Sequence, residues 1–187
     1  MKRTPTGTTL PPDIDDLSSF SKPFTVHIIP QAHIDLAWMW TRDDARGMIL
    51  ETFRAHVDAL ERDKRFTYAQ SQLYAYRVVE RYDPPLFDRI RRLIAEGRWE
   101  VVGGQWVETD NALPSGESHI RQLLWGCRYA QKKLRTTCRV AWCPDSFIAQ
   151  PPVLAAMFLE AGMKYFVFKR PREKFQRLPV CPFIWTA

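Results

Sequence analysis

The sequence predicts an α/β fold built on a parallel sheet. Short runs rich in β-branched and aromatic residues alternate five times with segments of helical periodicity, which is the pattern of strands joined by helices. Polar side chains also gather directly after these runs, where open parallel sheets and β/α barrels bind their ligands. With 187 residues and 45% hydrophobic content, the chain is long enough for one domain with a substantial core.

The expected elements follow one another in a regular order. Residues 1–22 are polar and contain prolines, so we expect them to form a flexible arm before a domain that spans residues 23–187. The expected strands cover residues 24–30, 66–71, 99–103, 138–142, 165–168 and 182–185. The expected helices cover residues 43–60, 72–82, 84–96, 116–134 and 151–159.

Helical spacing of apolar residues predicts which helix faces are buried. The first helix has a stripe made of Ala45, Met48, Ile49, Thr52, Phe53, His56, Val57 and Leu60. We interpret His56 on this stripe as a core or boundary histidine and not as a ligand. The long fourth helix, capped by Ser115 or Ser118, has a stripe made of Ile120, Leu123, Leu124, Cys127, Ala130 and Leu134.

Composition excludes several classes of protein. The net charge of +6 comes from Arg and Lys spread among acidic residues, which is typical of solvated helix faces and not of nucleic-acid binding. No apolar stretch is long enough for a membrane span or a signal peptide. The four cysteines (Cys127, Cys138, Cys143 and Cys181) have no metal-site or disulfide-framework spacing, so we expect reduced thiols and a cytoplasmic location. No pattern predicts an oligomeric state.

Each expected strand delivers polar residues to one rim of the sheet. In order, these are His33 with Asp35, Gln70 with Ser71, Glu108 with Asp110, Asp145, and Lys169 with Arg170. Because the carboxyl ends of parallel strands share one edge, this distribution predicts a functional site there.

His33 and Asp35 are the first candidate metal ligands. They lie two residues apart on an extended segment, so their side chains can point the same way, and imidazole with carboxylate suits zinc or a similar divalent ion. Asp145 is the candidate third ligand, because it follows a strand and a proline that fixes the backbone. An ionised carboxylate beside a metal can also be a nucleophile toward a sugar anomeric carbon. The alternative for Asp35 and for Asp145 is a capping role in a turn.

Further candidates would contact a substrate. Trp38 could stack on a sugar face or could be buried against the first helix. Glu108 and Asp110 could bind hydroxyl groups or act as acid or base. Arg170 could orient the Asp145 carboxylate through a bidentate bond, and its alternative is a solvated loop cation.

Several ordered segments resemble glycoside hydrolase family 38, the zinc-dependent retaining α-mannosidases. The matching segments are His33–Trp38, Gly103–Glu117, Arg121–Gly126, Trp142–Phe147 and Phe168–Pro171. The resemblance runs from about Thr25 to the end of the chain, lies in the N-terminal part of the family's catalytic domain and is closest to the cytosolic and bacterial branch.

The resemblance implies a fold and a set of roles. It implies a seven-stranded β/α barrel-like fold, of which this chain would hold about five to six strands. It implies that His33 and Asp35 bind zinc, and that Asp145 is both a zinc ligand and the nucleophile that forms a covalent mannosyl-enzyme. It also implies that Trp38 forms a stacking wall for the sugar with Phe147 nearby, and that Arg170 steadies Asp145.

Two departures from the family pattern qualify this expectation. Ile148 stands where the family usually has glycine, and the family's further zinc-binding histidine and general-acid aspartate lie well downstream of the matched segments. We therefore expect an incomplete catalytic domain that recognises α-mannosides or mannose-containing oligosaccharides but has little or no hydrolytic activity as this chain alone.

Two alternative functions stay open at this point. A metal-dependent polysaccharide deacetylase also uses His and Asp at strand ends, but it needs a His-x-x-x-His pair. The four histidines, His27, His33, His56 and His119, do not provide that spacing. A relative that binds sugar or metal without turnover is the second alternative.

Overall fold

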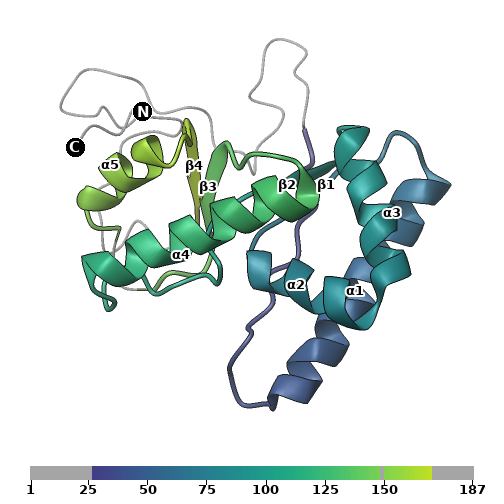
Figure 1. Ribbon diagram of the computed structural model, residues 1–187, viewed down its shortest axis with the longest axis horizontal. Coiled ribbons are helices and arrows are strands. Elements are labelled where there is room, and N and C mark those ends of the chain that lie inside the picture. The colour runs from purple at the N-terminus through teal and green to yellow at the C-terminus, as the bar shows by residue number, and fades with distance from the viewer. Residues whose placement is uncertain (1–26, 148–149, 170–187) are drawn as a thin grey trace, which may run out of the picture.

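A computed structural model describes residues 27–147 and 150–169 of the chain (Figure 1). Its elements are α1 (Arg42–Arg62), β1 (Tyr68–Gln70), α2 (Leu73–Tyr82), α3 (Pro84–Ala95), β2 (Trp99–Val101), α4 (Gly116–Tyr129), the π-helical turn η2 (Ala130–Leu134), β3 (Val140–Cys143), α5 (Val153–Glu160) and β4 (Tyr165–Phe168). This alternation of strands and helices confirms the predicted α/β class.

The described strands form two parallel pairs. β1 pairs with β2 from Tyr68 opposite Trp99, and β3 pairs with β4. A single backbone bond of 2.8 Å, from the amide of Gly103 to the carbonyl of Val140, links the segment after β2 to β3. The described strands do not close into a barrel, so the seven-stranded barrel stays a prediction.

The larger part of the core lies between the first three helices and the β1–β2 pair, away from α5 (Figure 1), and the same core continues to Leu154 and Phe158 of α5. Phe53 of α1 packs edge-on against Tyr76 at 5.2 Å between ring centroids and lies 5.4 Å from Trp99. All three side chains are at most 1% exposed, so their burial contributes on the order of 2 kcal/mol each. His56 is half-buried and stacks on Tyr68 at 4.0 Å, which confirms its boundary role.

Local signals explain where the helices begin and end. α1 begins with a capping box between Thr41 and Asp44. The side chain of Asp83 accepts a bond from the amide of Leu86, with Pro84 in the first turn of α3. Gly97 follows that helix with φ +71°, a left-handed conformation that glycine adopts without strain.

The strand predicted to end at Pro30 is reduced to one bridge in the described residues. Gln31 pairs with Ala69 alone, while Ile28 and Ile29 are 79% and 60% exposed. Among the described residues, this segment pairs only with β1 on one side. The pairing is short, so the side chains of Ile28 and Ile29 stay uncovered. Residues 24–26 lie outside the described residues.

The stripe predicted on α4 is partly wrong. Ile120 and Leu124 are half exposed, whereas Leu123 is buried as expected. The helix turns its small residue Gly126 toward the sheet, where a Cβ would overlap the Gly104 carbonyl oxygen. This close backbone contact sets the rotation of α4 about its axis. Ile120 and Leu124 therefore face solvent.

Three other sequence predictions cannot be placed. The N-terminal arm (1–22), the strand at 182–185 and Arg170 lie outside the described residues. Within the described residues, no helix combines the length and the apolar character needed to cross a membrane.

Candidate metal centre

Three predicted ligands meet beyond the carboxyl ends of the strands. His33 and Asp35 follow the bridge at Gln31, and Asp145 lies two residues after β3. Their ligand atoms all lie within 4.8 Å of one another. The Nε2 atom of His33 lies 3.1 Å from an Asp35 carboxylate oxygen and 3.7 Å from an Asp145 carboxylate oxygen. One imidazole nitrogen and two carboxylate oxygens therefore surround one point.

Glu108 stands behind these ligands. One of its carboxylate oxygens lies 3.0 Å from Nδ1 of His33, and the other accepts a 2.8 Å hydrogen bond from the backbone amide of Asp145. Its side chain is only 7% exposed. A carboxylate on the second nitrogen of a histidine is the usual outer partner of a metal-binding imidazole, because it fixes the ring and leaves the other nitrogen for the ion.

The electrostatics of the cluster favour a cation. The pKa of His33 is raised to about 9, chiefly by the contact with Glu108, while partial burial acts in the opposite direction and Asp35 adds to the rise. The imidazole therefore holds a proton at neutral pH among three carboxylates. A divalent ion could replace that proton, and a donor set of one nitrogen and two oxygens suits zinc.

Two glutamines fasten the segment that carries His33. The side-chain amide of Gln70 donates to the carbonyl of Ala32 at 3.1 Å, and that of Gln72 donates to the carbonyl of Ile34 at 2.8 Å. The carbonyls on both sides of His33 are thus held by two residues at the carboxyl end of β1 that are spaced two apart. The sequence pattern predicted Gln70 at the rim but not Gln72. The two-residue spacing between them could have indicated Gln72 as well.

Asn111 joins the loop after β2 to the loop after β3. Its backbone amide donates to the hydroxyl of Ser146 at 3.0 Å, and its side-chain amide donates to Gln150 at 2.7 Å. Its carbonyl lies 3.2 Å from Nε2 of His119 on α4. Asn111 is 1% exposed, so these contacts fix the loop after β3 that carries the nucleophile candidate Asp145. No periodic pattern of residues indicates this role of Asn111.

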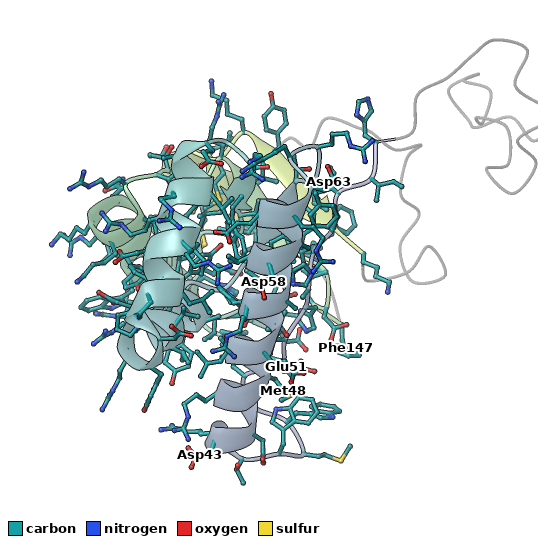
Figure 2. All side chains as sticks on the ribbon, turned by 90° about the vertical axis from the view of Figure 1, so that its right-hand side faces the viewer. Asp43, Met48, Glu51, Asp58, Asp63 and Phe147 are labelled. Atoms are coloured by element: carbon teal, nitrogen blue, oxygen red, sulfur yellow. The ribbon has the colours of Figure 1, made fainter. Side chains whose placement is uncertain are left out.

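The predicted sugar contacts are placed less tightly. Trp38 and Phe147 are 60% and 53% exposed, and Figure 2 shows Phe147 projecting outward at the level of Glu51 on α1. One carboxylate oxygen of Asp110 is buried and has no hydrogen-bond partner among the described residues. The substrate roles of Trp38, Phe147, Glu108 and Asp110 stay predictions, and Arg170 lies outside the described residues.

Comparison with protein families gives a match over most of the chain. Residues 23–187 match the family model described as glycosyl hydrolases family 38 N-terminal domain. Alpha-mannosidase G of Dictyostelium discoideum is 32% identical over 165 residues, which cover 87% of this chain and 15% of that protein. Human alpha-mannosidase 2C1 is 33% identical over 66% of this chain and 12% of its own length. The chain thus spans a small part of these relatives.

Solved structures share the fold. An alpha-mannosidase from Enterococcus faecalis V583 aligns with a TM-score of 0.65 and 22% identity, over 75% of this chain and 16% of that chain. A 4-alpha-glucanotransferase from Thermococcus litoralis aligns with a TM-score of 0.59 and 21% identity, over 75% of this chain and 22% of that chain. At these identities the likeness concerns the fold alone.

Proposed function

Because the chain belongs to glycosyl hydrolase family 38, we propose that it carries the metal centre and the nucleophile of a retaining α-mannosidase. The observation that carries this proposal is the convergence of His33, Asp35 and Asp145 within 4.8 Å at the carboxyl ends of parallel strands. The relatives named above are called alpha-mannosidases, which supports an α-mannoside or a mannose-containing oligosaccharide as the substrate.

His33, Asp35 and Asp145 would hold a zinc ion, which would act as a Lewis acid and coordinate hydroxyl groups of the sugar. The chemistry of the site supports this assignment, because three carboxylates surround a single imidazole and leave a net negative charge. The backbone amide of Asp145 is already bonded to Glu108, so its carboxylate is held at a fixed point of the rim.

Asp145 would attack the anomeric carbon of the mannoside. A bond forms between its carboxylate oxygen and that carbon, the bond to the leaving oxygen breaks, and a general acid protonates the leaving group. Water then hydrolyses the mannosyl ester of Asp145, so the product keeps the α configuration. The exposed rings of Trp38 and Phe147 would stack on the apolar face of the sugar.

We also propose that the described strands are part of a seven-stranded β/α barrel-like domain. The bond from Gly103 to Val140 supports this, since it brings the two parallel pairs next to each other. The likeness to solved structures at TM-scores of 0.65 and 0.59 supports a shared architecture.

Metal content is the direct test of this proposal. We expect the purified protein to bind near-stoichiometric zinc by elemental analysis, and an Asp35→Ala variant to bind little. The matched control is Asp43→Ala, which removes a carboxylate that is 76% exposed on α1 and outside the cluster. A wild-type protein that takes up no zinc from excess would overturn the metal centre.

The nucleophile is tested separately. A fluorinated mannosyl fluoride should leave a covalent adduct on Asp145, detected by peptide mass spectrometry. An adduct on another carboxylate would overturn the assignment of Asp145.

A further inference from the structure

We infer that Gln72 is a positioning residue that sets the distance between the two loops of the metal centre. Its side-chain amide donates to the carbonyl of Ile34 at 2.8 Å, and its side-chain oxygen accepts the backbone amide of Glu108 at 3.2 Å. This inference rests on the proposed metal centre and deepens it.

The two partners of Gln72 lie next to the candidate ligands. Ile34 lies between His33 and Asp35, so a hydrogen bond to its carbonyl fixes the position of the segment that carries both residues. Glu108 contacts Nδ1 of His33 and the backbone amide of Asp145. A single amide side chain therefore connects the two loops that carry the candidate ligands. Its two hydrogen-bonding ends are both used, and the residue is 5% exposed.

The backbone of Gln72 is held in an unusual conformation. Its φ of 65° and ψ of 90° lie in the left-handed half of the map, and Arg135 is the one other non-glycine residue with positive φ among the described residues. The next two amides explain how this conformation is enforced. Leu73 donates to the carbonyl of Gln105 at 3.1 Å, and Tyr74 donates to the carbonyl of Trp106 at 2.9 Å.

The direction of the Gln72 side chain follows from this strain. Had the residue stayed extended like the strand before it, or turned at once into α2, its side chain would take another direction. A long side chain at a position where glycine fits best indicates that its contacts have a role, because backbone strain in a folded protein concentrates at functional positions.

Two substitutions separate positioning from folding. Gln72→Ala removes the side chain and keeps the backbone strain, whereas Gln72→Gly removes the side chain and relieves the strain. The matched control is Gln122→Ala. The side chain of Gln122 accepts the backbone amide of Val107 at 2.8 Å, one residue before Glu108, and no hydrogen bond among the described residues joins it to residues 33–35.

The measurement is binding of Co²⁺ and Zn²⁺ to the whole chain. Titration calorimetry gives Kd, and the visible absorption of bound Co²⁺ reports the geometry of its ligands. Thermal unfolding followed by circular dichroism gives Tm for each variant without metal.

We expect Gln72→Gly to have a higher Tm than Gln72→Ala, while both bind metal about 10- to 100-fold more weakly than wild type and give an altered Co²⁺ spectrum. Gln122→Ala should keep the wild-type Kd and spectrum. A Gln72→Gly variant that is unfolded, or that binds metal with an unchanged Kd and spectrum, would overturn the role of Gln72. Failure of the wild-type chain to bind either metal would instead overturn the proposed metal centre itself.

Discussion

The core beneath α1–α3 and the polar rim at the strand ends differ in what holds them together. In the core, Phe53, Tyr76 and Trp99 are at most 1% exposed and pack ring against ring. At the rim, His33 keeps 27% of its side chain exposed among charged groups and is fixed through side-chain hydrogen bonds to the backbone around it. Apolar burial therefore supplies the stability in the core, whereas the charges and hydrogen bonds of the rim would suit a cation.

Removal of a core ring should have the largest effect. Phe53→Ala is expected to lower the free energy of unfolding by about 3–5 kcal/mol, because it leaves a cavity between Tyr76 and Trp99. Urea unfolding measures this change. Met39→Ala is the control, since that side chain is 86% exposed and its loss should change stability by less than about 0.5 kcal/mol. An equal loss in both variants would contradict the contrast between core and surface.

The charge of His33 should make the metal-free protein sensitive to pH. The pKa of His33 in the folded state, about 9, lies above its value of 6.5 in the absence of interactions. The stabilisation is therefore fully present below pH 6.5 and is lost as the pH rises through 9. Its full linkage value is about 3 kcal/mol, of which we expect roughly half because the site is partly exposed. Chemical denaturation across this pH range measures the loss.

Two observations would sharpen the pH prediction. His33→Gln should flatten the pH dependence, because the variant has no imidazole to titrate. Zinc binding at pH 7.5 should release about one proton, which calorimetry in buffers of different ionisation enthalpy detects. Binding without proton release would show that His33 is neutral in the metal-free protein.

Substitution of Gly126 in α4 should change packing, with a smaller loss of stability than removal of the Phe53 ring. Gly126→Ala places a Cβ against the backbone of Gly104 and Gln105, so the loop or α4 must shift, at a cost of about 1–3 kcal/mol. Gly47→Ala is the matched control in α1, because nothing lies within 4 Å of its Cβ position. That substitution should stabilise the helix by about 0.5–1 kcal/mol. The two alanine variants should therefore move Tm in opposite directions.

Removal of a ligand carboxylate should have the smallest effect on stability. Asp35→Ala loses a contact with His33 but also relieves repulsion from Asp145, so the metal-free free energy of unfolding should change by less than about 0.5 kcal/mol. The rise of Tm on adding zinc should nevertheless disappear. A large loss of stability in the metal-free variant would mean that the rim contributes to the fold like the core.

Local patterns predicted the parts of the fold that depend on neighbours in sequence. The apolar spacing of α1 gave its buried residues, and Asp83 with Pro84 gave the start of α3. The convergence of His33, Asp35 and Asp145 was also predictable, because strand ends converge and because the surrounding segments resemble a known family.

Long-range contacts decide the remaining features, so the sequence could not reveal them. The rotation of α4 depends on Gly126 meeting Gly104, which lies 22 positions earlier in the chain. Gln72 looked like the first residue of a helix, and its positive φ depends on bonds from the next residues to the loop after β2. Asn111 likewise owes its role to partners on two other segments, the loop after β3 and α4.

The weak attachment of the segment before α1 has a kinetic consequence. A full strand would be anchored by a ladder of backbone bonds, whereas residues 31–35 are held by one bridge at Gln31, by the amides of Gln70 and Gln72, by the burial of Ile34 and by the contact of His33 with Glu108. Such a segment can detach while the core stays folded, and its amide hydrogens should exchange with solvent long before those of α1. We therefore expect the half of the cluster formed by His33 and Asp35 to separate from Asp145 while the core stays folded, which would give an ion a path in and out.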